Sequence, residues 1–135
     1  MSFRRTLFDR HSNPWSAWTR WASTPLVLVP VWTLRWRDAA LVSAWLLLNP
    51  VIFPKPADDG NWATRAILGE ELWITQRPSD AGLALSAVTS AAAVCALVGA
   101  RRRNIGVAVT ATAVQMGLTL VYWEMMARYR DRQLA

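Results

Sequence analysis

Cysteine and histidine are nearly absent from this sequence, which holds one of each, Cys95 and His11. A single cysteine cannot close an intramolecular disulfide, so a disulfide-stabilised scaffold is excluded. A single histidine excludes a haem held by two histidines, and no Cys/His cluster with the spacing of a metal site occurs. Glycine-rich phosphate loops and recognisable nucleophilic serine motifs are missing as well. The sequence therefore predicts no metal ion and no cofactor, and it favours a non-catalytic protein.

Charged residues are missing from four long stretches, which are residues 21–34, 39–54, 81–100 and 104–123. A helix of about 20 mostly apolar residues crosses the ~30 Å hydrocarbon core of a bilayer. The last two stretches have that length, whereas the first spans only if it borrows flanking residues, so three spans remain an alternative to four. A soluble domain of 135 residues has room for about one helix that is apolar on all sides. We therefore predict an all-α integral membrane bundle of about four helices, a multi-pass protein of the cell membrane.

We predict a single membrane domain over residues 1–135. Its parts are a basic tail (1–13), a first helical hairpin (14–54), an amphipathic connector (55–79), a second helical hairpin (80–127) and a basic tail (128–135). The turn of the first hairpin is expected at residues 35–38. Its second helix should end near Asn49-Pro50, because proline disfavours helix in the residue before it.

Helix-start and helix-breaking signals lie in the first half of the first hairpin. Ser12 or Asn13 can cap a helix whose first residue is Pro14, since the missing N–H of proline would be unpaired there anyway. Pro25 and Pro30 lie inside the same apolar segment. Proline removes a backbone hydrogen bond, so we expect a kink or a broken first turn in this helix.

Most of the nine tryptophans lie at the ends of the apolar stretches or in the connector. Tryptophan collects at the headgroup level of membranes because its ring is apolar and its N–H needs a polar partner. Trp45 lies in the middle of a stretch, so its N–H needs a partner inside the protein. In the connector, Trp62, Ala66, Gly69 and Trp73 repeat at helical spacing after a start signal at 58–61. This pattern predicts a short amphipathic helix, either flat on the membrane with its Trp side down or packed on the ends of the bundle.

Small residues are spaced along both helices of the second hairpin, and they include Gly82, Ser86, Ser90, Ala92, Ala96, Ala100, Gly106, Thr110, Ala113 and Gly117. Lipid provides no hydrophobic push between helices, so close approach through small residues holds them together. Gln115 is the one strongly polar residue deep in this hairpin, and a symmetrical hairpin predicts its hydrogen bond to Thr89 or Ser90. Glu124 and Arg128 have the spacing of a structural ion pair on one helix.

The chain has 15 Lys+Arg against 9 Asp+Glu and a net charge of +6. Its arginines lie at the ends of the predicted helices, where lipid phosphate is the nearest anion, so we expect membrane lipid and no nucleic acid as a partner. With four spans, ten basic residues lie with the termini and connector and five lie at the two hairpin tips. This distribution favours cytoplasmic termini, but a tip of three arginines (101–103) opposes it, and the orientation stays open.

Polar residues predicted near one membrane face form the candidate site, which consists of His11, Arg20, Arg65, Glu70 and Glu71. A lone charge at a membrane edge is costly, so we expect Arg20 to pair with a carboxylate of the connector. Structural pairing is the favoured interpretation, and an acid–base or headgroup-binding site is the alternative. Convergence of His11, Arg65 and Glu70 on one pocket would favour an enzyme.

Three segments carry a resemblance: HSNPWSAWTR at 11–20, NPVIFPKP at 49–56, and WATR with GEELW within 62–73. They resemble a family of small, Trp-rich, multi-pass prokaryotic membrane proteins that is catalogued as a domain of unknown function. The resemblance implies a multi-pass membrane protein from a bacterium or archaeon. It brings no activity, substrate or catalytic residue.

Three functional hypotheses follow from the sequence. The first is a non-catalytic membrane interaction or assembly protein, associating with itself or with another membrane protein. The second is an enzyme acting on a lipid or isoprenoid headgroup. The third is a small-solute carrier or channel formed by oligomers, which the lack of intramembrane charges disfavours.

Overall fold

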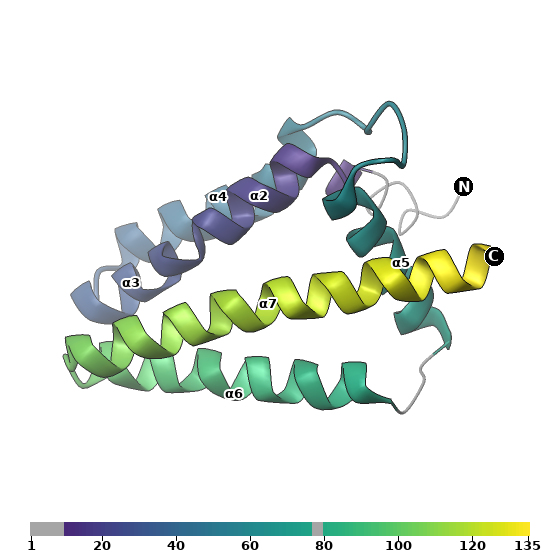
Figure 1. Ribbon diagram of the computed structural model, residues 1–135. Coiled ribbons are helices and arrows are strands. Elements are labelled where there is room, and N and C mark those ends of the chain that lie inside the picture. Colours follow the sequence, from purple (N-terminus) through teal and green to yellow (C-terminus); the bar gives the residue numbers. More distant parts are fainter. Residues whose placement is uncertain (1–9, 77–79) are drawn as a thin grey trace.

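The computed structural model describes residues 10–76 and 80–135, and within them every regular element is a helix. In chain order these are α2 (Pro14–Ala22), the 3-10 helix η1 (Thr24–Val27), α3 (Leu28–Thr33), α4 (Trp36–Ile52), α5 (Trp62–Gln76), α6 (Ala81–Arg101) and α7 (Ile105–Leu134). The all-α prediction is confirmed. Figure 1 shows two layers of long helices, with α5 running across them at the end where the C-terminus lies.

The first helix of the first hairpin is interrupted at Ser23, after the nine residues of α2 and two residues before Pro25, and not in its first turn. Asn13 caps α2, and its side chain accepts a hydrogen bond from the backbone N–H of Trp15 at 2.9 Å. The α-helix stops at Ala22, and a 3-10 turn containing Pro25 leads into α3. Pro30 lies inside the short α3 helix. The first segment is therefore a broken helix that lies beside α4.

The boundaries of α4 differ from the prediction at both ends. The turn consists of only two residues, Leu34 and Arg35, and Leu34 has a φ of 57°. The helix begins directly after them, at Trp36. At the other end it continues through Pro50 to Ile52, two residues beyond the expected end near Asn49-Pro50. Pro50 lies in the last turn, where the loss of one backbone hydrogen bond is tolerated.

Side-chain hydrogen bonds join α4 to the broken helix. Asn49 is fully buried; its Oδ1 accepts from Ser16 Oγ at 2.8 Å, and its Nδ2 donates to Thr19 Oγ1 at 2.9 Å. Trp45 Nε1 donates to Ser23 Oγ at 2.8 Å. The expectation that the mid-stretch tryptophan finds a partner inside the protein is thus confirmed.

The second hairpin is held by close backbone approach instead. A Cβ placed on Gly99 of α6 would lie 2.7 Å from the backbone nitrogen of Ala108 on α7. Ala96 and Ala100 are buried at this interface, as their spacing predicts, whereas Gly117 has open space around it. The last helix continues to Leu134, so residues 128–134 are helical and do not form a separate tail.

The amphipathic helix α5 packs on the protein with its tryptophan side. The ring of Trp62 lies 5.8 Å from that of Trp18 and 5.9 Å from that of Trp123, centre to centre. Trp73 meets Tyr122 edge to face. The stripe therefore faces α2 and α7, as in the second of the two readings of the connector, and not a membrane surface.

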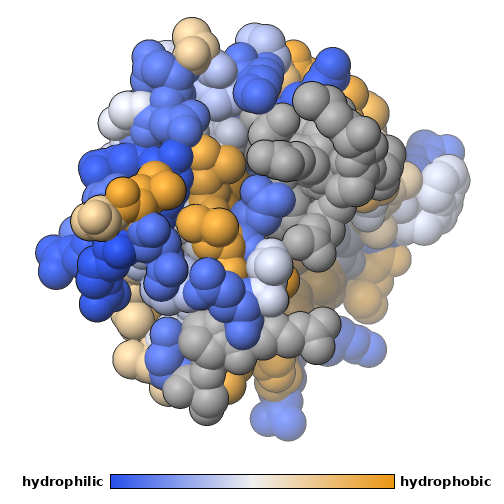
Figure 2. All heavy atoms as spheres, turned by 90° about the vertical axis from the view of Figure 1, so that its right-hand side faces the viewer, coloured by the Kyte–Doolittle hydropathy of each residue, from blue (hydrophilic) through white to orange (hydrophobic). Residues whose placement is uncertain are grey.

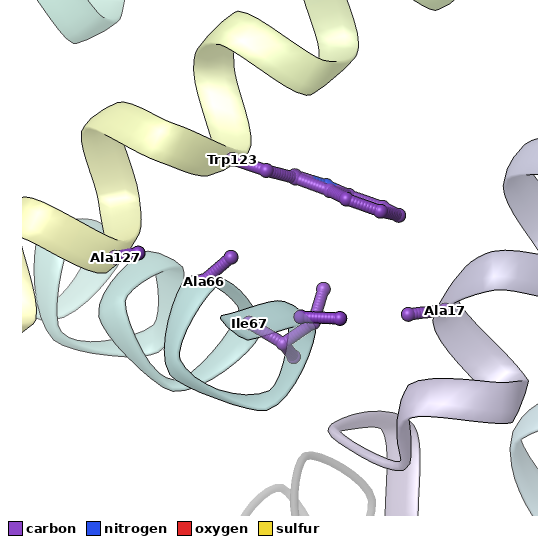
Figure 3. Packing of buried hydrophobic residues seen from close by; sticks show 6 residues of the cluster. Ala17, Ala66, Ile67, Trp123 and Ala127 are labelled. Atoms are coloured by element: carbon purple, nitrogen blue, oxygen red, sulfur yellow. The ribbon is translucent and has the colours of Figure 1, made fainter. Parts of the chain in front are cut away.

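A small apolar core lies where α2, α5 and α7 meet. Figure 3 shows the Trp123 ring projecting from α7 toward Ala17 of α2, with Ala66 and Ile67 of α5 beside it. Helix α5 approaches α7 so closely at Gly69 that a Cβ there would lie 2.0 Å from the carbonyl oxygen of Met126. This packing fixes the connector against the bundle.

Two helices, α6 and α7, are long and apolar enough to cross a membrane by length and composition. Only 11% of each apolar window is buried inside the protein, so most of these side chains face outward. The end of the molecule at α5 is different: Figure 2 views that end and shows mostly hydrophilic residues, with a narrow band of hydrophobic ones between them.

Candidate ligand pocket between α2, α5 and α7

A pocket of about 260 Å³ lies beside the small core and is bounded by α2, α5 and α7. Its lining combines ionisable, amide, hydroxyl and indole groups: His11, Arg20, Trp21, Thr24, Ile67, Glu70, Gln115, Thr119 and Trp123. Three of the five candidate site residues, His11, Arg20 and Glu70, therefore converge on one pocket. A second hollow, of about 250 Å³ between α3 and the start of α7, is lined by Leu28, Val29, Trp32, Thr33, Ile105, Ala108 and Val109.

Arg20 is held in place by the segment that precedes α2. Its Nε donates to the carbonyl oxygen of Ser16 at 3.2 Å, its Nη2 donates to that of His11 at 3.4 Å, and its Nη1 contacts His11 Nε2. Burial, and secondarily the charge of Arg20, lowers the pKa of His11 to about 4. The imidazole is therefore neutral at pH 7 and accepts a hydrogen bond from the guanidinium.

Glu70 reaches the pocket from α5. Its Oε1 accepts a hydrogen bond from the hydroxyl of Tyr122 on α7 at 3.1 Å. Burial raises the pKa of Glu70, while the Tyr122 hydrogen bond and the charge of Arg20 act in the opposite direction. Arg20 and Glu70 are both among the described residues, but they form no ion pair with each other. The expected pairing of Arg20 with a carboxylate of the connector is therefore not found.

Gln115 lines this pocket and does not bond across the second hairpin. Thr89, its predicted partner, donates instead to the carbonyl oxygen of Leu85 at 2.8 Å. Among the described residues, no hydrogen bond of the Gln115 side chain is found. Thr119, one turn further along α7, lines the pocket beside it. The predicted Gln115 contact to Thr89 or Ser90 is therefore wrong.

The other two candidate residues lie elsewhere. Arg65 points away from the pocket, and its Nη1 pairs with Asp131 Oδ2 at 2.8 Å. Glu71, the neighbour of Glu70 on α5, does not line the pocket. The predicted pair of Glu124 and Arg128 is confirmed at 2.6 Å. The candidate residues are thus split between one polar pocket and several surface pairs.

The sequence carries a signal for the polar side chains that α7 presents toward α2 and α5. Gln115, Thr119 and Tyr122 are spaced by four and three residues, which puts them on one face of a helix. That spacing, together with the isolation of Gln115 in an apolar stretch, predicts a polar stripe on α7. It does not predict that the stripe faces α2 and α5, because the direction depends on how the hairpins pack.

The chemistry of the pocket suits binding. In residues 10–76 and 80–135, no three His, Cys, Asp or Glu side chains lie close enough together to hold a metal ion. The pocket offers one cation, one carboxylate, an imidazole, an amide and two hydroxyls, together with two indole rings. A neutral imidazole with a pKa near 4 is a weak base, so His11 serves in this pocket as a hydrogen-bonding group and not as a general base at neutral pH.

These features define an all-α protein with two helices apolar enough for a membrane and a small polar pocket at one end. The chain belongs to the family of unknown function DUF6653, which it matches over residues 3–128. The resemblance to a domain-of-unknown-function family is thereby confirmed. No curated protein and no solved structure matches the chain.

Proposed function

We propose that this chain is a multi-pass membrane protein with four membrane-embedded segments, and that it acts without catalysis. In this proposal it associates with lipid and with other membrane proteins or further copies of itself. The segments are the broken helix α2–η1–α3, then α4, α6 and α7. Helix α5 lies outside the hydrocarbon, against the end of the bundle.

The observation that carries the proposal is the outward direction of the large apolar side chains. They are exposed along three helices, at Leu41, Leu47, Leu48, Val88, Val94, Val109, Val114 and Val121. Soluble monomers rarely expose contiguous apolar surface on this scale, whereas lipid tails cover such surface without cost. The core helix of a soluble protein is mostly buried, but α6 and α7 are not.

Helix lengths support the same arrangement. At 1.5 Å per residue, α6 with 21 residues extends about 31 Å, which matches the hydrocarbon thickness. Helix α7 with 30 residues extends about 45 Å and must project beyond it. The projecting part carries ion pairs to α5 and its preceding loop, Arg65–Asp131 and Arg130–Asp59. Polar pairs therefore gather where α7 leaves the apolar layer.

The hairpin tips lie together, which supports a common orientation for both hairpins. The guanidinium carbon of Arg103 lies 5.7 Å from the centre of the Trp32 ring. In this four-segment arrangement the two termini and the connector are assigned to the other end, and these parts of the sequence hold ten of its fifteen Lys and Arg. The positive-inside rule assigns this end to the cytoplasm.

An enzyme acting on a lipid headgroup is the second candidate. It is favoured by the convergence of His11, Arg20 and Glu70 on one pocket. It is disfavoured by the separation of Arg65 from that pocket and by the low basicity of His11. A carrier or channel has less support still, because residues 21–33, 39–52, 81–100 and 105–123 of the proposed segments hold no charged side chain.

Labelling from the two sides of the membrane tests the topology. In a Cys95→Ala background, Ala57→Cys places a thiol in the connector and Arg102→Cys places one at an exposed tip. We expect a membrane-impermeant maleimide to label the Arg102→Cys variant in intact cells and the Ala57→Cys variant only in inverted vesicles. Labelling of both variants from the same side would contradict the four-segment arrangement.

The association is tested by the mass of the particle extracted in a mild detergent. Native mass spectrometry should find the chain with a second copy or with another membrane protein. A single copy with no protein partner, extracted under conditions that preserve known membrane complexes, would contradict the association while leaving the topology intact.

A further inference from the structure

We propose that the pocket between α2, α5 and α7 binds a zwitterionic headgroup, that is, an ammonium group next to a phosphate or carboxylate. Phosphoethanolamine has this chemistry, whether as the headgroup of a membrane lipid or as a free molecule. The proposal deepens the proposed function by naming a ligand class. It rests on that function only for the position of the pocket near a membrane.

Opposite charges held apart in one pocket carry the argument. Arg20 and Glu70 both line it, and they attract each other, yet they do not close into an ion pair. Arg20 is anchored by His11 and Ser16, and Glu70 is anchored by Tyr122. A ligand with an anionic and a cationic group satisfies both side chains at once, whereas a ligand of single charge leaves one of them uncompensated.

The remaining lining supplies the contacts that such a ligand needs. Gln115 brings an amide with both donor and acceptor capacity, and Thr119 brings a hydroxyl. Trp21 and Trp123 form apolar walls, and indole faces attract ammonium groups. The indole N–H of Trp21 is already used by the carbonyl oxygen of Met116 at 3.1 Å, which fixes that ring in position.

Size and position agree with a headgroup and not with a whole lipid. The pocket holds about 260 Å³, below the range of roughly 300–1,000 Å³ that drug-sized ligands occupy. On α7 its lining extends from Gln115 to Trp123, up to the last residue before the charged part of the helix. A headgroup bound there would sit at the edge of the apolar layer with its acyl chains alongside the helices.

Binding to the purified chain in detergent tests the proposal, with tryptophan fluorescence as the readout. The probes are short-chain phosphatidylethanolamine and phosphatidylglycerol with identical acyl chains. The wild type should bind the ethanolamine lipid about 10-fold more tightly, a difference of about 1.4 kcal/mol. Equal affinity for the two lipids would overturn the proposal.

Two neighbouring carboxylates provide a matched pair of variants. Glu70→Gln keeps the shape and the acceptor for Tyr122 but removes the charge, so the preference for ethanolamine should fall to about twofold or less. Glu71→Gln makes the same change one residue away, outside the pocket, and should leave the preference unchanged. Full selectivity in a folded Glu70→Gln variant would overturn the assignment.

Gln115→Leu serves as a second variant if Glu70→Gln does not fold. It should weaken binding of the ethanolamine lipid several-fold without lowering the unfolding temperature, since its side chain has no hydrogen bond among the described residues. Unchanged affinity would count against the site. Competition by free phosphoethanolamine would identify a soluble zwitterion as a ligand, and its failure would restrict the site to the lipid. Because this measurement uses detergent, it can succeed even if the proposed membrane topology fails.

Discussion

The two hairpins solve the same packing problem with different chemistry. In the first, side chains of Ser16, Thr19 and Asn49 form hydrogen bonds between α2 and α4. In the second, Gly99 brings the backbones of α6 and α7 together, and the Ala108 backbone would meet any added Cβ. The hairpin interrupted by prolines is held by hydrogen bonds between polar side chains. The uninterrupted hairpin is held by close backbone packing, which its small residues allow.

The difference follows from what each segment can offer. A helix broken at Ser23 presents hydroxyl and carbonyl groups that need partners, so a polar neighbour stabilises it. Two straight helices rich in alanine and glycine approach closely enough for dispersion contacts to hold them. The variants below act on one mechanism at a time.

Gly99→Ala should have the largest effect, because the new methyl group would overlap the backbone of Ala108. Overpacking of this kind costs about 2 kcal/mol. Gly117→Ala on α7 is the control, since nothing lies within 4 Å of the added carbon. Thermal unfolding in detergent measures both variants. Equal unfolding temperatures would show that close approach does not hold the second hairpin.

Asn49→Leu should weaken the first hairpin, because Ser16 and Thr19 lose a buried partner. Interhelical hydrogen bonds in membranes are worth about 0.6 kcal/mol each, up to about 1.7, so a loss of about 1–2 kcal/mol is expected. Ser43→Ala, on an exposed face of the same helix, is the control. A variant as stable as the control would mean that the first hairpin, too, is held by packing alone.

Acid should weaken the first half of the molecule through His11. Its pKa is about 4 in the folded protein and 6.5 when exposed, so between these values the unfolded chain binds more protons and stability falls as the pH falls. Glu70, with its raised pKa, acts oppositely, so the effect is best isolated in His11→Gln. Between pH 7 and pH 4.5, the wild type should lose more stability than this variant. Parallel pH profiles would show that His11 is not held in its neutral form.

Trp45→Phe should have the smallest effect of the series. It removes the hydrogen bond from the indole to Ser23 Oγ and keeps most of the apolar ring. The expected loss is about 0.6 kcal/mol, read from thermal unfolding beside the Asn49→Leu variant. A loss larger than that of Asn49→Leu would place the main polar support at the helix break and not at Asn49.

Local signals in the sequence predicted several helix starts, those of α2, α5 and α6 among them. Asn13 with Pro14, and Pro25 within an apolar segment, each act on the backbone of their own neighbourhood, so their effects do not depend on the fold. The end of α4 was missed because Pro50 interrupts only one hydrogen bond, in the last turn. Such boundary errors are small and do not alter the architecture.

The faces of helices were harder to predict than their ends. A symmetrical hairpin about Arg102 places Gly99 opposite residue 105, but Gly99 meets Ala108. A shift of one residue in the register between α6 and α7 changes the direction of the facing side chains by about 100°. Because of this shift, Gln115 faces the pocket and not Thr89. Three of the nine lining residues, His11, Arg20 and Glu70, were therefore recognised, and the α7 side of the pocket required the packing.

The central claim is that the outward faces of these helices lie in lipid, and the native thiol of Cys95 tests it most directly. This side chain is exposed in the middle of α6. In intact and in opened membranes, a hydrophilic maleimide should fail to label the wild-type chain until detergent is added, because hydrocarbon excludes both the reagent and the reactive thiolate. Rapid labelling without detergent, or recovery of the chain in the aqueous fraction, would contradict the claim.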